Sequence, residues 1–271
     1  MRRAADSGHD AAADSWPYPR LLAHRGGGTL APENTLAAIR IGCSYGLRAF
    51  ECDAMLAADR VAVLIHDPTL ERTTSGHGAV AATTSTALGR LDAGSWHSAR
   101  FAGEPVPTLE RVLEFCRASG VWINVEIKPA PGHEPETGTV VAQTVARHYP
   151  GGAGRDAERA AAGEVPAPLL SSFSVAALAA ARAAEPELRR GLLCDRPAPD
   201  WHAQLAALQC VALHCNHRAL DAPFAAQVKA AGYGLLCYTV NSPRRAAQLR
   251  AWGVDAICTD RIDLFAERAD A

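Results

Sequence analysis

The chain has 271 residues, of which 48% are hydrophobic, so it can bury a full core as one large domain or two small ones. Its formal net charge of -2 is spread along the sequence without a basic or acidic block, which argues against nucleic acid or a membrane surface as the partner. No apolar run reaches the ~18 residues of a membrane span.

The N-terminal stretch predicts a leader outside the folded domain. Residues 1–19, MRRAADSGHDAAADSWPYP, contain two arginines but no apolar stretch behind them, so they are typical of a disordered leader and not of a secretion signal. Residues 20–271 are then expected to form a single domain. The eight cysteines stand singly, mostly within apolar segments and without CxxC spacing. Buried free thiols are the expected explanation, and they predict a reducing, cytoplasmic location.

Short apolar runs alternate with amphipathic segments along the rest of the chain. The predicted strands start near residues 21, 47, 61, 121, 168, 191, 211, 234 and 254, and the predicted helices near 34, 108, 137, 174, 200, 221, 243 and 262. Thr108 and the Ser242-Pro243 pair are typical helix starts, and Gly120 is a typical helix end. Strands that alternate with helices in this number predict an α/β fold, a closed TIM (β/α)8 barrel.

Two stretches interrupt the alternation. Only seven residues separate Asp53 from Val61, too few for a crossover helix, so the second and third strands are expected to form a hairpin. Residues 67–108 are rich in Thr, Ser and Gly and follow the third strand directly. Because active sites lie at the carboxyl ends of barrel strands, we expect this small insertion to lie over the active-site mouth. Trp96 either lines that mouth or anchors the insertion's own core.

Ionisable side chains gather at the ends of four predicted strands. They are His24, Glu51, Asp53, His66, Glu126 and Lys128. Residues two apart on a strand face the same side, so Glu51 pairs with Asp53, and Glu126 with Lys128. An ordinary surface ion pair could explain each residue alone, but not all six at the same end. Three carboxylates in one place would repel one another, so we expect a divalent cation, with oxygen ligands that favour Mg²⁺ or Ca²⁺ over zinc.

The remaining groups suggest chemistry on a phosphate. Two histidines that are not needed as ligands can divide acid and base work. Arg25 and Lys128 beside a cation form a clamp suited to phosphate oxygens, and together these groups indicate phosphodiester cleavage. Glycines at 26–28 are expected to let the backbone and a substrate pass close to His24.

Other polar residues have weaker signals. His214, Cys215 and His217 lack the spacing of a zinc site, so we expect no zinc there. Asn241 is expected to start the turn before Pro243 or to belong to the site, and Asp260 is expected to serve the last loop.

The ordered motifs AHRG, PENT, ECD, IHD, EIK, SSF, YTVN and GVDAICTD resemble those of the glycerophosphodiester phosphodiesterases. The similarity runs from about residue 20 to about residue 265. It is nearest to the cytoplasmic bacterial type associated with the Ugp glycerol-3-phosphate uptake system.

This resemblance implies a TIM-barrel hydrolase that releases sn-glycerol 3-phosphate and an alcohol from glycerophosphodiesters such as glycerophosphocholine and glycerophosphoethanolamine. It also implies a place in lipid and glycerol metabolism. By matching motifs, His24 and His66 correspond to the catalytic pair, Glu51, Asp53 and Glu126 to the metal ligands, and Arg25 and Lys128 to phosphate-contacting residues. Tyr238 stands where many relatives have tryptophan, so it is expected to keep an aromatic wall beside the substrate.

Two alternatives stay open at this point. A phospholipase C- or D-like lipid phosphodiesterase would also use two histidines as acid and base. It should have an apolar rim or a membrane anchor, which the sequence does not indicate. A non-catalytic phosphate-ester binding barrel should have lost a histidine or a carboxylate, and all are present. We therefore expect a small-molecule substrate, with neither nucleic acid nor a membrane as partner. The sequence leaves open the metal, the head group, the oligomeric state and whether water or a glycerol hydroxyl attacks first.

Overall fold

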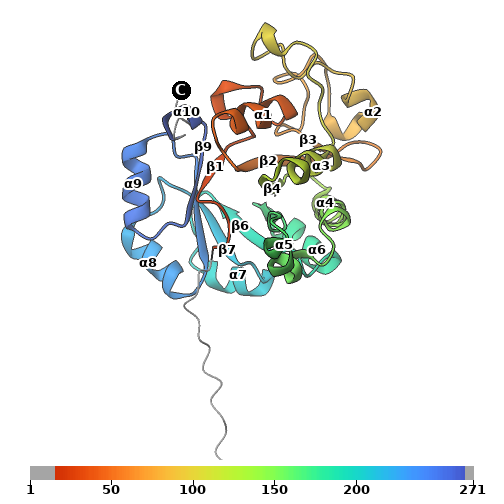
Figure 1. The fold of residues 1–271 in the computed structure, drawn as a ribbon. Helices are drawn as coiled ribbons and strands as arrows, with labels where there is room; N and C mark the ends of the chain where they lie inside the picture. Colours follow the sequence, from red (N-terminus) through yellow and green to blue (C-terminus); the bar gives the residue numbers. More distant parts are fainter. Residues whose placement is uncertain (1–15, 266–271) are drawn as a thin grey trace, which may run out of the picture.

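The computed structural model of the protein describes residues 16–265, and it has the α/β architecture that the sequence predicts. The strands are β1 (Leu21–Ala23), β2 (Ala49–Leu56), β3 (Ala62–Leu64), β4 (Trp122–Ile127), β5 (Leu169–Ser172), β6 (Arg190–Cys194), β7 (Ala212–Asn216), β8 (Gly234–Tyr238) and β9 (Ala256–Thr259). All of these strands except β3 run parallel, in the order β1-β9-β8-β7-β6-β5-β4-β2, and β1 also pairs with β2. The sheet is therefore closed, and the predicted TIM barrel is confirmed (Figure 1).

Helices cover the outside of the barrel, except for the short α2, which lies in the segment that follows β3 (Figure 1). The helices are α1 (Leu36–Ser44), α2 (Ser85–Leu88), α3 (Leu109–Ser119), α4 (Glu134–His148), α5 (Asp156–Ala161), α6 (Val175–Ala184), α7 (Trp201–Leu208), α8 (Ala222–Ala230), α9 (Pro243–Ala251) and α10 (Ile262–Phe265). The Thr108 hydroxyl accepts from the Arg111 amide at the start of α3, and Gly120 ends that helix at φ 61°. Ser242 caps α9, in which Pro243 is the first residue. These ends are where the sequence places them, but α2 and α5 are not predicted by the apolar periodicity.

The strand β3 is the irregular one, as the short connection after Asp53 predicts. It pairs antiparallel with the far end of β2, with Leu56 opposite Ala62. The segment after β3, from 67 to 108, buries a small core of its own against this hairpin, formed by Met55, Val63, Leu70, Val80 and Leu88 among others. Figure 1 shows this insertion in orange to yellow, beyond β3 at one side of the barrel. That it covers the mouth stays a prediction.

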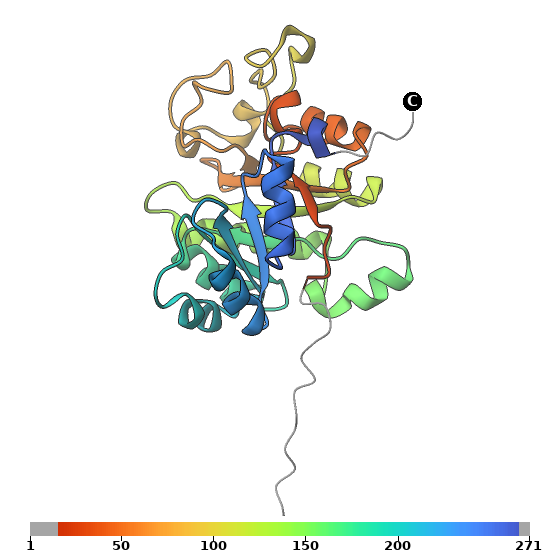
Figure 2. The same ribbon diagram turned by 90° about the vertical axis from the view of Figure 1, so that its left-hand side faces the viewer.

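The other end of the barrel is filled by the residues just before β1. Trp16 and Tyr18 are only 4% and 6% exposed, although the expected leader includes them. Tyr18 stacks on Trp122, the first residue of β4, with ring centroids 4.4 Å apart. Figure 2 shows this segment entering from the end of the molecule away from the insertion. Residues 16–19 thus belong to the barrel, and the rest of the expected leader, 1–15, lies outside the described residues.

Two expectations about composition can be compared with the structure. All eight cysteines are free thiols, and most of them are buried. Within residues 16–265, no helix combines the length and the apolar character needed to span a bilayer.

Candidate active site

The carboxyl ends of the barrel strands surround a cavity of about 210 Å³. All of the site residues predicted from the sequence line it: His24, Arg25, Glu51, Asp53, His66, Glu126, Lys128 and Tyr238. A larger groove of about 440 Å³ lies beside α3 and α4, lined by Arg117, His148 and Glu164 among others, and it contains none of these residues. The chemistry of the lining, and not the volume, therefore identifies the candidate site.

Three carboxylates form the centre of the cavity. Glu51, Asp53 and Glu126 each offer an oxygen, and these oxygens all lie within 4.8 Å of one another. Burial and the neighbouring Asp53 charge raise the pKa of Glu51 to about 7 and that of Glu126 to about 8. Within the described part of the chain, Glu51 Oε1 is buried without a hydrogen-bond partner. A divalent cation would supply the missing partner and the opposite charge, so these residues fit a hard cation with oxygen ligands.

Two cationic side chains flank the carboxylates. Lys128 Nζ lies 3.2 Å from Glu126 Oε1 and 3.5 Å from Asp53 Oδ1, and Arg25 Nε lies 3.5 Å from Asp53 Oδ2. Burial lowers the pKa of both cations, but the neighbouring carboxylates outweigh it, so the pKa of each is raised and both stay charged. Burial raises the pKa of Asp53, but Arg25 and Lys128 outweigh it and hold that pKa below its usual value. Arg25 and Lys128, which are predicted to contact the phosphate, thus lie beside the predicted cation site.

The loop between β1 and α1 brings one backbone amide and one side-chain amide into the site. Arg25 and Asn34 adopt φ angles of 51° and 59°, which side-chain-bearing residues rarely do. The Arg25 amide donates to Glu51 Oε2 at 3.1 Å, and the Asn34 side-chain amide donates to Asp53 Oδ2 at 2.8 Å. A Cβ on Gly28 would lie 2.1 Å from the Asp260 carbonyl oxygen. The glycine is therefore required by the close approach of the loop after β9.

His24 is held by a residue that the sequence assigned to the last loop. Its Nδ1 lies 2.5 Å from Asp260 Oδ1, and Asn241 donates to the other Asp260 oxygen at 3.0 Å. A carboxylate accepts, so the hydrogen bond places a proton on Nδ1 and leaves Nε2 for the site, 3.8 Å from Glu51 Oε2. Burial lowers the pKa of His24, but the Asp260 hydrogen bond and the Glu51 charge outweigh it, and the net shift is upward.

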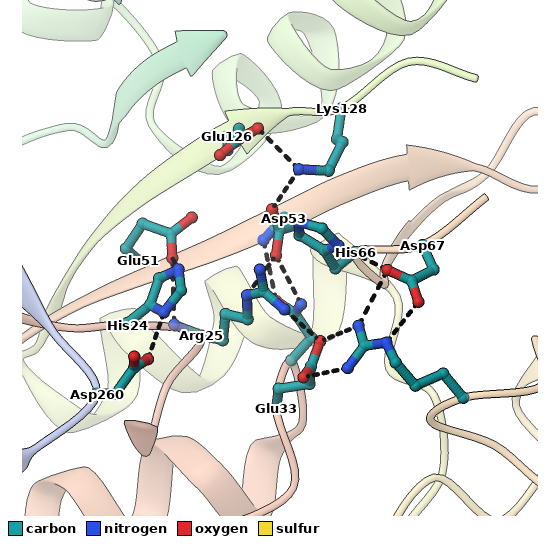
Figure 3. Close-up of polar contacts among 12 residues, drawn as sticks. His24, Arg25, Glu33, Glu51, Asp53, His66, Asp67, Glu126, Lys128 and Asp260 are labelled. Atoms are coloured by element: carbon teal, nitrogen blue, oxygen red, sulfur yellow. Dashed lines mark hydrogen bonds and ion pairs between the residues drawn. The ribbon is translucent and has the colours of Figure 1, made fainter. Parts of the chain in front are cut away.

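His66, which follows β3, has a matching arrangement. Its Nδ1 lies 2.7 Å from Asp67 Oδ1, and burial lowers its pKa despite the nearby charges of Asp53 and Asp67. Figure 3 shows His24 beside Glu51 and His66 beside Asp53, with one carboxylate behind each imidazole. Asp67 directly follows His66 in the chain, and this adjacency could have identified it as a histidine partner.

Two aromatic rings, those of Tyr238 and Phe173, border the cavity. The Tyr238 hydroxyl donates to the Cys194 carbonyl at 2.9 Å, and its ring meets Phe173 edge-on with centroids 6.0 Å apart. Phe173 is 45% exposed. Ser171 also lines the cavity, and it accepts a hydrogen bond from Asn124 at 2.9 Å.

Other residues singled out in the sequence lie elsewhere. Trp96 is exposed on the insertion, outside the cavity lining, and donates to the Ala93 carbonyl at 2.8 Å. His214 lines the cavity and is buried. His217 lies just after β7 and contacts Arg245 of α9. The two histidines therefore have different surroundings.

A parallel barrel with a polar cavity at the carboxyl ends of its strands defines the class as a TIM-barrel enzyme. Comparison with known proteins gives the family. Residues 24–264 match the Glycerophosphoryl diester phosphodiesterase family, so the chain belongs to that family of phosphoric diester hydrolases.

Relatives cover almost the whole chain. A glycerophosphodiester phosphodiesterase of Caldanaerobacter subterraneus is 31% identical over 246 residues, which is 89% of this chain and 93% of the relative. A phosphodiesterase structure from Oleispira antarctica, in complex with the product sn-glycerol-3-phosphate, is 34% identical with a TM-score of 0.83, covering 94% of this chain and 98% of that one. The glycerophosphodiester phosphodiesterase of Agrobacterium tumefaciens is 29% identical with a TM-score of 0.72, over 91% and 98% of the two chains. The Ugp association stays a prediction.

Proposed function

We propose that the protein hydrolyses glycerophosphodiesters, such as glycerophosphocholine and glycerophosphoethanolamine, to sn-glycerol 3-phosphate and an alcohol, with Mg²⁺ or Ca²⁺ bound at Glu51, Asp53 and Glu126. The observation that carries this proposal is the position of the three carboxylates, within 4.8 Å of one another, between two histidines that each have a carboxylate behind Nδ1. The product complex of the Oleispira antarctica relative supports the choice of substrate.

The chain's own residues can be assigned to the steps of the reaction. Arg25 and Lys128 would bind the non-bridging phosphate oxygens, where negative charge develops as the diester is attacked. One histidine would take the proton from the attacking oxygen, and the other would give a proton to the leaving alcohol oxygen as the phosphorus–oxygen bond breaks. The attacking oxygen belongs either to water or to the neighbouring glycerol hydroxyl, in which case water opens a cyclic phosphate in a second step. A bound divalent cation supplies charge neutralisation of the phosphate in either route.

The two aromatic rings are proposed to border the departing alcohol. Tyr238 and Phe173 offer ring surface at the open side of the cavity, whereas the charged groups lie on the side of Asp53. The free thiols support a reducing, cytoplasmic location, and we propose neither nucleic acid nor a membrane as partner. The exposed ring of Phe173 would favour a lysophospholipid, so the test includes that substrate.

The test is coupled detection of sn-glycerol 3-phosphate from a panel of glycerophosphodiesters, and of choline or phosphocholine from lysophosphatidylcholine, whose cleavage leaves the acyl chain on the glycerol, with and without a chelator. We expect release from the glycerophosphodiesters, its loss in chelator and its return on addition of Mg²⁺ or Ca²⁺. Turnover that persists unchanged in excess EDTA would contradict the cation requirement. Turnover of the lysophospholipid alone would favour the lipid phosphodiesterase, and binding of the diesters without turnover would favour the non-catalytic barrel.

A further inference from the structure

One arginine of the insertion, Arg72, lies at the edge of the site. Arg72 donates from Nε to Asp67 Oδ2 at 2.5 Å and from Nη2 to Asp67 Oδ1 at 3.0 Å. It also donates from Nη1 and Nη2 to the two oxygens of Glu33, both at 2.8 Å. One guanidinium therefore binds two carboxylates, each through both of its oxygens.

Each of these carboxylates holds a residue of the site. Asp67 accepts from His66 Nδ1 at 2.7 Å, and Glu33 accepts from Arg25 Nη1 at 2.7 Å. The result is a continuous chain of hydrogen bonds, His66–Asp67–Arg72–Glu33–Arg25. Figure 3 labels four of its members, His66, Asp67, Glu33 and Arg25, around Asp53. The chain of hydrogen bonds links the end of β3 to the end of β1 without passing through the carboxylates of the cation site.

We propose that Arg72 is a positioning residue that orients His66 through Asp67 and Arg25 through Glu33. This inference rests on the proposed function, in which His66 transfers a proton and Arg25 binds the phosphate. Arg72 itself does not line the cavity, so it acts through the two carboxylates and not on the substrate.

The chemistry of the contacts favours orientation over stability. The Arg72 side chain is 45% exposed, and ion pairs at such positions contribute little to the free energy of unfolding. A planar guanidinium that binds both oxygens of a carboxylate fixes the plane of that carboxylate, which a lysine ammonium cannot do. The Arg72 hydrogen bonds also hold the pKa of Asp67 well below its usual range, so Asp67 stays an acceptor for the His66 Nδ1 proton.

The rest of the insertion is fixed in the same place. Leu70 and Thr73 on either side of Arg72 are buried, and Glu104 near the far end of the insertion accepts from the Ala37 amide of α1 at 2.9 Å. The segment that carries Arg72 is therefore held both by its own small core and by the helix that follows β1. This explains how a segment outside the barrel can set the orientation of side chains inside it.

The test compares Arg72→Ala and Arg72→Lys with Arg90→Ala, an exposed arginine of the same insertion that serves as matched control. Loss of an outer hydrogen-bonding partner typically lowers activity about 10–100-fold. We expect Asp67→Asn to lower kcat by that amount with little change in KM, and Glu33→Gln to raise KM about tenfold. Arg72→Ala should both lower kcat and raise KM. Arg72→Lys should recover only part of the lost activity, and Arg90→Ala should have the kcat and KM of the wild type.

Double-mutant cycles give the sharpest result. Adding Arg72→Ala to Asp67→Asn should lower kcat much less than it does in the wild type, because the contact is already lost. Additive effects in this cycle, or wild-type kcat and KM in Arg72→Ala, would overturn the proposal. A loss of kcat with unchanged KM that parallels a lower melting temperature would also overturn it, since a merely structural role predicts that pattern. Arg72→Lys, which keeps the charge, gives the same decision if Arg72→Ala does not fold.

A spectroscopic measurement separates this inference from the proposed function. In protein labelled with ¹⁵N-histidine, the Nδ1 proton of His66 should give a hydrogen-bonded imidazole signal, assigned by its absence in His66→Gln. The signal should be lost or shifted in Arg72→Ala and unchanged in Arg90→Ala. If the wild type releases no glycerol 3-phosphate, the proposed function fails, and this spectrum still decides the positioning role. A His66 signal that is identical in Arg72→Ala would overturn it.

Discussion

Replacing His214 by glutamine should make the fold less sensitive to acid. His214 is 1% exposed on β7, its Nε2 faces Gly191, and Trp16 meets its ring edge-on at 6.2 Å. Burial lowers its pKa to about 3, from 6.5 in the unfolded chain. Between these values the unfolded state binds more protons, so the free energy of unfolding decreases as pH falls and the effect is absent above the unfolded pKa.

The size of this effect follows from the two pKa values. One pH unit in this window corresponds to about 1.4 kcal/mol, so at a pH about two units below the unfolded value the wild type should lose about 3 kcal/mol more than His214→Gln. Urea unfolding at pH about 7 and about 4.5, followed by tryptophan fluorescence, measures both losses. His77→Gln, an exposed histidine of the insertion, is the control and should keep the wild-type acid sensitivity. Equal losses in the wild type and His214→Gln would refute the reasoning.

Glu126→Gln should weaken divalent-cation binding in calorimetry and remove glycerol 3-phosphate release without unfolding the barrel; full turnover would contradict a ligand role. Asp260→Asn should lower kcat about 10–100-fold with an unchanged circular dichroism spectrum, because His24 loses its orienting carboxylate. An unaffected kcat would show that the His24–Asp260 contact does not contribute to catalysis. Glycerophosphocholine, glycerophosphoethanolamine and glycerophosphoglycerol should react at rates within roughly tenfold, since the cationic clamp binds the shared phosphate. An analogue without the hydroxyl next to the phosphate-bearing carbon should react far more slowly, and comparable rates would reject hydroxyl recognition. Trp16→Ala should lower the free energy of unfolding by about 3–5 kcal/mol in urea titrations, whereas wild-type stability would show that the ring is not part of the barrel core.

The barrel was predictable because its signals are local. Each strand is a short apolar run, and helix starts such as Thr108 and Ser242 carry their own capping chemistry. The helix α5 was missed because the alanine- and arginine-rich segment around it has little apolar periodicity. Trp16 and Tyr18 were placed in a leader because their burial depends on the open end of a closed barrel, which a stretch of sequence cannot show.

The candidate site was likewise predictable only where its signals are local. Glu51, Asp53 and Glu126 were predictable as a cluster because parallel strands end at one rim and residues two apart share a face. The partners of the histidines were not, because they depend on loop paths: Arg72 reaches Asp67 only after the chain has turned within the insertion. Sequence adjacency could have suggested Asp67, whereas nothing local connects Asp260 to His24, which are 236 residues apart.

The pairing of β1 with β9 has a consequence for how the protein is made. During synthesis β1 can pair with β2 as soon as that strand is made, but its other edge stays unpaired until β9 follows, because Leu21 pairs with Ile257. The His24–Asp260 contact forms only at this last closure. A nascent or prematurely ended chain would therefore hold its acidic residues in a partly formed sheet with one imidazole unsupported, and full chemical competence would arrive together with the final strand.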